Sequence, residues 1–383
     1  MADEKEFKEG LEDVVAGTSR ITDVNGSEGK LIYGGYDIHD LAQNTTFEEV
    51  VYLLWHGELP TQQQLSQLNA ELDAHRALPA PAWDLIRQFP PKAAPMDALR
   101  TGVSLLGLYD PDTGDDSLEA NRRKALRLVA QMGTLVATLS RRRDGQDPIP
   151  VKAGLGTAGS FLHQLTGREL DETASRALDV ALILHADHEL NASTFSARVT
   201  VATLTDMYSA ITSAVGTLAG PLHGGANVNV MHLLEKIGTP DRAEEVVTQM
   251  LAQGQKIPGI GHRVYRALDP RAVSLRQMSQ QLAETTGDSK WYEISERVQQ
   301  AADKALAAKG KTTLKANVDF FSASVYHMLG IPTEQFTPVF AVSRVAGWTA
   351  HVLEQLENNR LIRPRAIYTG PRDLKVTPLA QRG

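Results

Sequence analysis

The feature that most constrains this fold is the long succession of helical patterns that follows residue 45. Leu65, Leu68 and Leu72 recur at the three- and four-residue spacing of a single helix face. Similar patterns fill the segments 96–110, 121–142, 172–190, 241–254, 291–310 and 336–359. Runs of β-branched residues alternating with helices are missing, so a parallel sheet is not expected. The sequence therefore predicts an all-α protein.

The N-terminal part carries one exception, a signal for a short β-hairpin. The segments 20–24 and 30–38 flank the letters "NGSEG". The dipeptide Asn25-Gly26 favours a tight turn between two strands. A short hairpin is therefore expected before the first long helix.

Loops rich in Gly or Pro divide the helical patterns. They lie at 220–227, 257–261 and 363–371. Because loops of this kind mark domain crossings, we expect a smaller helical domain at 225–329. It would be inserted into a larger domain formed by 1–224 and 330–383.

Charge and composition exclude several classes of protein. The chain has 383 residues, a net charge of −7 and a pI near 5.9, which argues against nucleic-acid binding because that needs a basic face. It has no cysteine, so it can form no disulfide or thiolate metal site. No apolar run approaches the ~20 residues of a membrane helix. The opening "MADEKEFKEG" lacks a secretory pattern, so a cytoplasmic location without membrane contact is expected.

Two Gly-rich segments resemble nucleotide-binding motifs. Gly154, Gly156 and Gly159 form "GLGTAG", which matches the dinucleotide fingerprint, but two prolines precede it where a strand is needed. The segment 305–313 resembles a relaxed phosphate-binding loop, yet it follows a helical pattern. An NAD-dependent oxidoreductase built on "GLGTAG" is kept as a remote alternative.

The letters "HADHE" place His185 and His188 three residues apart, on one face of the expected helix. The zincin pattern is absent and no third ligand is evident, so no metal site is predicted. One of the pair could be a buried core histidine. The residues that follow are polar, which favours the alternative interpretation that the two histidines lie at the rim of a pocket.

Three further segments combine an ionisable side chain with glycine or apolar neighbours. His223 lies in "GPLHGGAN", where Gly224 and Gly225 would let a ligand approach the backbone closely. His262 lies in "KIPGIGHRVYRALDPR", among Lys256 and several arginines, which suits an anion pocket. Asp319 lies in the apolar run "NVDFFSA", where it could be a desolvated general base or the N-cap of a helix near Phe321.

These residue types suggest one chemistry. A carboxylate of raised pKa can remove a proton from carbon. One histidine can then stabilise the enol oxygen, while the other protonates a carbonyl under attack. Arginines can hold the carboxylates of an anionic acceptor. This chemistry requires no metal and no flavin.

The segments "GPLHGGAN", "PGIGHRVYRALDPR" and "NVDFFSA", in this order, resemble the catalytic segments of the citrate synthase family. The stretches 11–38, 47–61 and 95–110 resemble that family's N-terminal half, so the likeness covers nearly the whole chain. It implies an all-α fold with a mobile small domain. It also implies an acyltransferase of the tricarboxylic acid cycle that condenses acetyl-CoA, a co-substrate rather than a permanently bound cofactor, with oxaloacetate.

The resemblance also assigns roles to residues. His223 would steady the enol of acetyl-CoA, Asp319 would remove the methyl proton and His262 would protonate the oxaloacetate carbonyl. The oxaloacetate site would hold His188, Arg271 and Arg344, with Arg363 reaching in from the other subunit of a homodimer. The coenzyme A site would comprise Lys256, Ile257, Gly259, Gly261, Arg266 and Asn317.

Two departures from the family pattern are Gly34, where relatives commonly carry Arg, and Ala316, where Pro is usual. The chain also lacks the additional N-terminal domain of NADH-inhibited hexamers, so neither property is expected. Two further alternatives stay open. One is a 2-methylcitrate synthase that uses propionyl-CoA, because one methylene discriminates by only ~1–3 kcal/mol. The other is a helical acyl-CoA binder without turnover.

Overall fold

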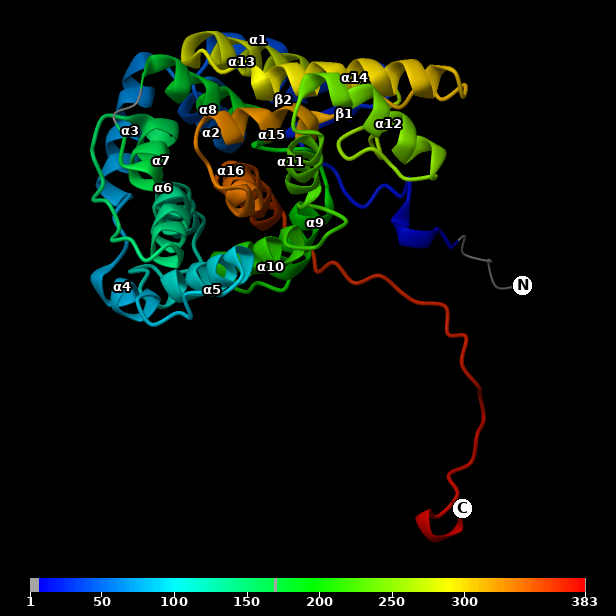
Figure 1. Ribbon diagram of the computed structural model, residues 1–383. Coiled ribbons are helices and arrows are strands. Elements are labelled where there is room, and N and C mark those ends of the chain that lie inside the picture. Colours follow the sequence, from blue (N-terminus) through cyan, green and yellow to red (C-terminus); the bar gives the residue numbers. More distant parts are fainter. Residues whose placement is uncertain (1–6, 169–170, 383) are drawn as a thin grey trace.

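The computed structural model describes residues 7–168 and 171–382, and within them helices dominate (Figure 1). The α-helices are α1 (Ile38–Asn44), α2 (Phe47–His56), α3 (Gln62–His75), α4 (Ala80–Ile86), α5 (Pro95–Leu108), α6 (Leu118–Arg143), α7 (Gly156–Thr166), α8 (Glu172–His185), α9 (Ala192–Val201), α10 (Met207–Leu218), α11 (Ala226–Ile237), α12 (Ala243–Ala252), α13 (Pro270–Thr286), α14 (Lys290–Ala307), α15 (Val318–Met328) and α16 (Phe336–Glu357). Short 3₁₀ helices are η1 (Glu9–Leu11), η2 (Pro240–Arg242), η3 (Thr333–Gln335) and η4 (Leu379–Gln381). The predicted all-α class is confirmed.

The expected N-terminal hairpin is present and is extended by one strand. Strands β1 (Thr22–Asn25) and β2 (Lys30–Tyr33) pair antiparallel, with Asn25 opposite Lys30. A third strand, β3 (Tyr36–Asp37), follows β2 after a turn and pairs with it. Gly34, one of the two departures, lies in this second turn at φ +53°, where glycine is the favoured residue.

The centre of the fold is α16. Every residue from Phe336 to Leu353 is buried, and the helix is surrounded by others on all sides (Figure 1). It packs against α6, α8, α9 and α10, and α6 is itself mostly buried. A helix enclosed in this way can hold polar side chains only if they are paired or face a site. Arg344 and His351 are such side chains.

Helices α11 to α15 form a connected layer, in which α13 packs on α15 and α12 packs on α14. This layer lies over α8 through α13 and α15 (Figure 1). Within the described residues, no helix is both long and apolar enough to cross a membrane.

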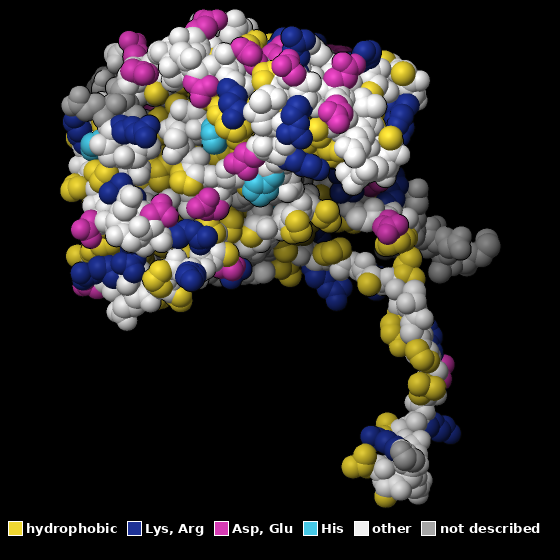
Figure 2. Space-filling view, in the orientation of Figure 1, with side chains coloured by type: hydrophobic (Ala, Val, Ile, Leu, Met, Phe, Trp, Pro, Cys, Tyr) yellow, Lys and Arg dark blue, Asp and Glu magenta, His cyan; other side chains and the backbone are white. Residues whose placement is uncertain are grey.

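The C-terminal segment after α16 runs away from the body as an extended chain (Figures 1 and 2). Several of its large apolar side chains are exposed, and they are Leu361, Ile367, Tyr368, Leu374, Val376 and Leu379. In Figure 2 these apolar atoms follow the tail beyond the globular part.

Candidate active site

Two loops of the candidate site are joined by backbone hydrogen bonds. The amide of Gly261 donates to the carbonyl oxygen of Lys315 (2.7 Å), and the amide of Asn317 donates to that of Gly259 (2.9 Å). Ile260 and Ala316 form an isolated antiparallel bridge between these bonds. The pairing fixes His262, the residue after Gly261, relative to Asp319, two residues after Asn317. Neither bond uses the amide of Ala316, so the residue that departs from the family pattern takes no part in them.

The ring of His262 has a defined tautomer. Its Nδ1 accepts the backbone amides of Val264 (3.0 Å) and Tyr265 (3.2 Å). Since Nδ1 accepts, the neutral ring carries its proton on Nε2. Burial, and next the charge of Arg271, lower the pKa of His262 to about 4. At neutral pH the side chain is thus an uncharged Nε2–H donor.

His223 has the opposite tautomer. Its Nε2 faces Ser193, accepting from the backbone amide at 3.3 Å and lying 2.8 Å from Oγ. The proton of the neutral ring is therefore on Nδ1. Burial, and next the charge of Arg344, lower the pKa of His223 to about 4. His223 thus offers an Nδ1–H group at neutral pH.

Asp319 is the second residue of α15 and is half-buried. The helix begins at Val318 and its N-cap is Asn317, whose side chain accepts the amide of Asp319 (3.0 Å). The interpretation of Asp319 as an N-cap for a helix near Phe321 is therefore wrong, because Asn317 occupies that position. Burial raises the pKa of the Asp319 carboxyl to about 6, although Arg271 and Arg344 oppose the rise. A carboxylate with this pKa is ionised at neutral pH and is more basic than an exposed one.

Two buried arginines supply positive charge. Arg271 forms a bidentate pair with Asp269, at 2.9 Å and 2.8 Å, and the attraction of Asp269 raises its pKa despite burial. Arg344 donates through Nε to the carbonyl oxygen of His185 (2.6 Å). Within residues 7–168 and 171–382, neither terminal nitrogen of Arg344 has a hydrogen bond, which leaves both for a ligand. The positive charge of Arg344 lowers the pKa of both His223 and Asp319.

His188 joins this group from the loop after α8. Its Nε2 forms a hydrogen bond with the hydroxyl of Tyr265 (3.1 Å), and its ring lies 5.5 Å from that of His262. The expectation that His185 and His188 share one helix face is wrong, because α8 ends at His185. His185 turns into the core and donates through Nδ1 to the carbonyl oxygen of Ala181 (2.7 Å). No group of three or more potential metal ligands occurs in the described part of the chain.

The residues expected at the coenzyme A site fall into two kinds. Ile257 and Gly259 are buried and shape the loop, in which a side chain on Gly259 would collide with Phe320. Lys256 and Arg266 are exposed cations on the same segment. The side chain of Asn317 donates to the carbonyl oxygen of Gly261 (2.8 Å), so its amide has a structural partner.

Arg363 lies apart from the other site residues. It is exposed and belongs to the extended C-terminal tail, which leaves the body of its own chain (Figure 1). The chain by itself therefore does not bring Arg363 to His188, Arg271 or Arg344.

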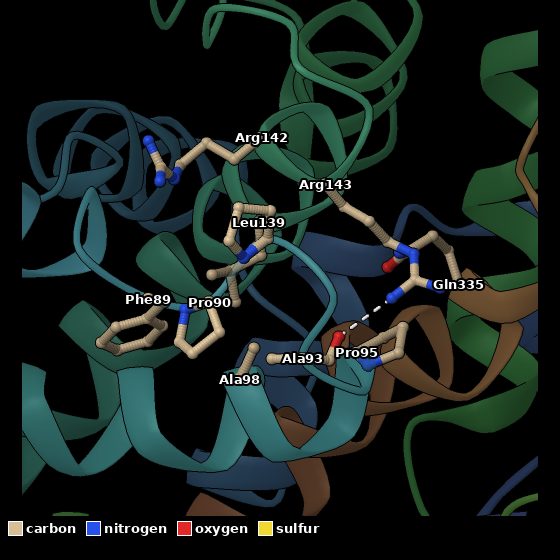
Figure 3. Close-up of a pocket in the computed structure, with 10 residues that line it drawn as sticks. Phe89, Pro90, Ala93, Pro95, Ala98, Leu139, Arg142, Arg143 and Gln335 are labelled. Atoms are coloured by element: carbon tan, nitrogen blue, oxygen red, sulfur yellow. Dashed lines mark hydrogen bonds between the residues drawn. The ribbon is translucent and has the colours of Figure 1, made fainter.

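Two cavities lie away from these residues. One, of about 20 Å³, is bordered by Phe89, Leu139 and Arg143 and is too small for more than a water molecule (Figure 3). The other, a groove of about 470 Å³, contains Gly156 and Gly159 of "GLGTAG".

The groove does not fit a dinucleotide. In the described part of the chain, the element before the motif is α6 and not a strand, and at the start of α7 the amide of Thr157 donates to the carboxylate of Glu48 (2.6 Å). A pyrophosphate needs those amides and would be repelled by that carboxylate. The dinucleotide-binding alternative is therefore wrong.

Comparison with known proteins identifies the family. A family model described as citrate synthase, C-terminal domain, matches residues 10–365. Citrate synthase 2 of Bacillus subtilis (strain 168) is 50% identical over 374 residues, covering 97% of this chain and 98% of that protein. This chain belongs to the citrate synthase family. Members of the family are acyltransferases, and this chain is accordingly an enzyme of that class.

Solved structures of the family have the same fold. The crystal structure of citrate synthase from Pyrobaculum aerophilum has a TM-score of 0.91 and 42% identity, covering 97% of this chain and 95% of that one. A citrate synthase from Thermoplasma acidophilum, solved as a ternary complex with carboxymethyl coenzyme A and oxaloacetate, has a TM-score of 0.89 and 34% identity, covering 98% and 100% of the two chains. A 2-methylcitrate synthase of Corynebacterium glutamicum is 40% identical over 384 residues, covering 99% of each chain.

Sequence reasoning missed the residues that orient the candidate groups. Ser193 sets the tautomer of His223, Tyr265 links His188 to the His262 loop, and Asp269 pairs with Arg271. Asp269 stands two residues before Arg271 in "LDPR", and that spacing could have suggested an ion pair. Ser193 and His223 are 30 residues apart, and no local pattern connects them.

Proposed function

We propose that this enzyme condenses acetyl-CoA with oxaloacetate and water to form citrate and CoA. The observation that carries the proposal is the pair of neutral histidines with opposite tautomers, together with the half-buried carboxylate of Asp319, whose loop is paired with that of His262. Such a group combines one base with two N–H donors of different direction. An aldol-type condensation of a thioester needs these three functions together.

The first steps use all three side chains. Asp319 removes a proton from the methyl group, while Nδ1–H of His223 donates to the carbonyl oxygen of the thioester as the enol forms. The enol carbon attacks the ketone carbon of oxaloacetate, and a C–C bond forms. As the ketone oxygen gains charge, it takes a proton from Nε2 of His262. Water then cleaves the thioester and releases CoA.

The charges nearby suit oxaloacetate. Arg344, whose terminal nitrogens form no hydrogen bond with any residue that the structure describes, and Arg271, held in place by Asp269, would bind its carboxylates. His188 lies beside His262 and would complete this site. The ternary complex of the Thermoplasma acidophilum relative supports a shared site for both substrates.

The exposed cations of the His262 loop would face coenzyme A. Lys256 and Arg266 suit its phosphates, while Ile257, Gly259, Gly261 and Asn317 would contact the rest of the molecule. Acetyl-CoA would bind and leave as a co-substrate, and no permanently bound cofactor enters the proposal.

The assembly belongs to the same proposal. We place a mobile small domain at 225–329, on a large domain of 1–224 and 330–383. The exposed tail with Arg363 would reach the site of a second copy in a homodimer, which would cover its apolar side chains. The enzyme would work in the cytoplasm.

Which acyl-CoA the enzyme prefers needs its own test, because a 2-methylcitrate synthase is 40% identical to this chain. Steady-state kinetics with acetyl-CoA and propionyl-CoA at saturating oxaloacetate decide it. We expect kcat/KM to favour acetyl-CoA by about tenfold or more. A preference for propionyl-CoA would select 2-methylcitrate synthesis, and CoA binding without turnover of either would reduce the protein to an acyl-CoA binder.

A further inference from the structure

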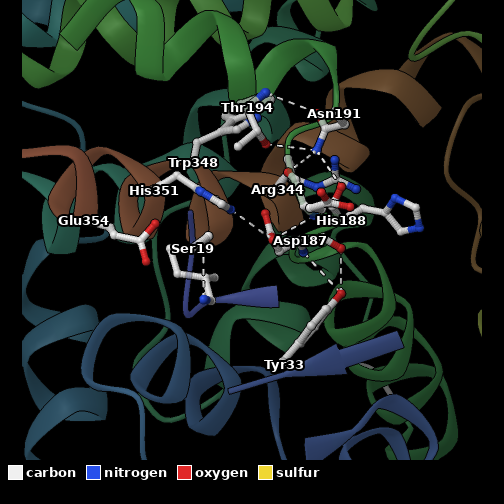
Figure 4. A network of polar contacts seen from close by, with 12 residues as sticks. Ser19, Tyr33, Asp187, His188, Asn191, Thr194, Arg344, Trp348, His351 and Glu354 are labelled. Atoms are coloured by element: carbon white, nitrogen blue, oxygen red, sulfur yellow. Dashed lines mark hydrogen bonds and ion pairs between the residues drawn. The ribbon is translucent and has the colours of Figure 1, made fainter. Parts of the chain in front are cut away.

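A buried polar network lies behind the expected oxaloacetate site (Figure 4). At its centre is Asp187, the residue before His188, with a fully buried side chain. Its carboxylate Oδ2 accepts from Nε2 of His351 (3.1 Å) and from the backbone amide of Glu189 (3.2 Å). Buried polar groups of this kind are expensive unless they are fully paired, so they need a reason to be there.

The tautomer of His351 is fixed by Arg198. An Nη1–H group of Arg198 donates to Nδ1 of His351 at 3.0 Å, and an arginine can only donate. His351 therefore carries its proton on Nε2 and donates it to Asp187. The same Arg198 nitrogen also donates to Glu354 (2.6 Å), which anchors the arginine. The hydrogen bonds of this network therefore all point the same way, from Arg198 to His351 and from His351 to Asp187.

Asp187 fixes the backbone on both sides of His188. The hydroxyl of Tyr33 accepts the Asp187 amide (3.2 Å) and donates to the Asp187 carbonyl oxygen (2.8 Å). Glu189 has φ +54°, a left-handed conformation that is uncommon for a side-chain-bearing residue. The bond from its amide to Asp187 Oδ2 is an Asx-type turn that stabilises this conformation.

The network also reaches Arg344. The amide of Gly347 on α16 donates to the carbonyl oxygen of Ala186 (3.1 Å), and any Cβ at Gly347 would lie 2.5 Å from Oδ1 of Asp187. This close contact holds α16 against the loop of His188. Asp187 Oδ1 has no hydrogen-bond partner among the described residues, and the negative charge of the Asp187 carboxylate raises the pKa of the nearby Arg344 guanidinium against the larger, lowering effect of burial.

We propose that Asp187 and His351 are positioning residues for the dicarboxylate site, in which the His351–Asp187 bond holds the His188 loop and the Arg344 guanidinium in one relative arrangement. The inference rests on the proposed function, since it concerns how oxaloacetate is held. Neither side chain touches the reacting atoms. Their loss therefore acts on oxaloacetate binding and leaves acetyl-CoA binding intact.

Three variants of α16 test the proposal. His351→Leu removes the donor to Asp187, whereas His351→Gln keeps an N–H at the same position and an oxygen for Arg198. Thr349→Val is the matched control, since Thr349 is equally buried on the same helix but bonds to Trp55 (3.0 Å), outside the network. Asp187→Asn is a second probe that keeps the shape and removes the charge, in case His351→Leu does not fold.

Steady-state kinetics and calorimetric titration of oxaloacetate are the measurements. We expect His351→Leu and Asp187→Asn to raise the KM and Kd for oxaloacetate by about tenfold or more, with the KM for acetyl-CoA unchanged. His351→Gln should stay within about threefold of wild type. Thr349→Val should lower only the melting temperature.

Different outcomes distinguish a failure of the positioning role from a failure of the proposed function. A purely structural role would lower the active fraction, and thus the apparent kcat, at unchanged KM for oxaloacetate, and that result would overturn the positioning role. Equal effects of His351→Leu and His351→Gln on KM would also overturn it, because the retained N–H would then be irrelevant. Wild-type enzyme that binds oxaloacetate but releases no CoA would instead overturn the proposed function.

Discussion

At the scale of single residues, protonation state is what distinguishes the candidate site from a cluster of polar groups. His223 and His262 are both neutral at neutral pH, yet their protons sit on opposite ring nitrogens. Backbone amides make the difference, from Ser193 in one case and from Val264 and Tyr265 in the other. Each ring therefore carries its N–H group on the nitrogen that does not face those amides, and this N–H group can donate to a substrate.

The pKa values predict the pH dependence of the reaction. Asp319 must be ionised to act as a base, and its pKa is raised to about 6 by burial. The kcat/KM for acetyl-CoA should therefore be flat above about pH 7 and fall about tenfold per unit below about pH 6. The histidines, with pKa values of about 4, protonate only further down. Constant activity from pH 7 down to pH 5 would rule out Asp319 as the titrating base.

Residue types could be predicted from the sequence, but their orientation could not. The motifs around His223, His262 and Asp319 named the ionisable groups, because glycine and apolar neighbours are local features. Ser193 and Asp187 act through contacts that span long sequence distances, at 30 residues to His223 and 164 to His351. The helix start at Val318 was missed because both Asn317 and Asp319 are good N-caps, and only the backbone decides between them.

At the scale of elements, the N-terminal hairpin supports the His262 loop. The amide of Arg266 donates to the carbonyl oxygen of Gly26 at the hairpin turn (2.8 Å). A Cβ at Gly26 would lie 2.3 Å from the carbonyl oxygen of Val264. The letters "NGSEG" predicted the turn correctly. The turn also makes close contact with a loop more than 200 residues away in the sequence, and no local sequence pattern predicts that contact.

Gly26→Ala tests this contact. The added methyl group would push the loop that holds Nδ1 of His262, so we expect kcat to fall by about tenfold or more. Gly17→Ala is the control, because a Cβ there meets nothing within 4 Å. Steady-state kinetics and thermal unfolding of both variants are compared. Unchanged kcat in Gly26→Ala would show that the hairpin does not support the catalytic loop.

At the scale of the whole molecule, the candidate site draws on distant parts of one chain and, we propose, on two copies. The sequence predicted the all-α class because the helical periodicity is long and strong. Arg363 could be assigned only by resemblance, since the chain alone leaves it in an exposed tail. A tail with several exposed apolar side chains is expected to be covered in solution.

The shared-site dimer predicts complementation between two inactive variants. Arg363→Ala and His262→Ala, co-expressed with different tags, should form mixed dimers with one intact site of the two. Purified mixed dimers should then recover about half of the wild-type activity per dimer, whereas each parent stays inactive. Mixed dimers without activity would argue that Arg363 serves the site of its own subunit.

Domain movement gives a second prediction at this scale. A dicarboxylate held by Arg271, within 225–329, and Arg344, outside it, would draw the two parts together. The radius of gyration from solution scattering should decrease on saturation with oxaloacetate. Arg271→Ala should lose the decrease. An unchanged radius at proven saturation would mean that binding causes no closure.

The proposed mechanism requires Asp319 as the base of the enolisation, and Asp319→Asn removes that base. Because burial raises the carboxyl pKa to about 6, the ionised group disfavours the folded state above that pH. A neutral asparagine removes this effect, so the variant should melt at a higher temperature at pH 7 and still bind oxaloacetate.

The deciding measurement is the rate of oxaloacetate-dependent CoA release from acetyl-CoA by the folded Asp319→Asn variant. We predict a loss of about 10²–10⁴-fold in kcat, the usual range for removal of a general base. The dissociation constant of oxaloacetate, measured by calorimetry, should stay within about threefold of wild type. If a variant shown to be folded and to bind oxaloacetate turns over within a few-fold of the wild-type rate, Asp319 is not the base.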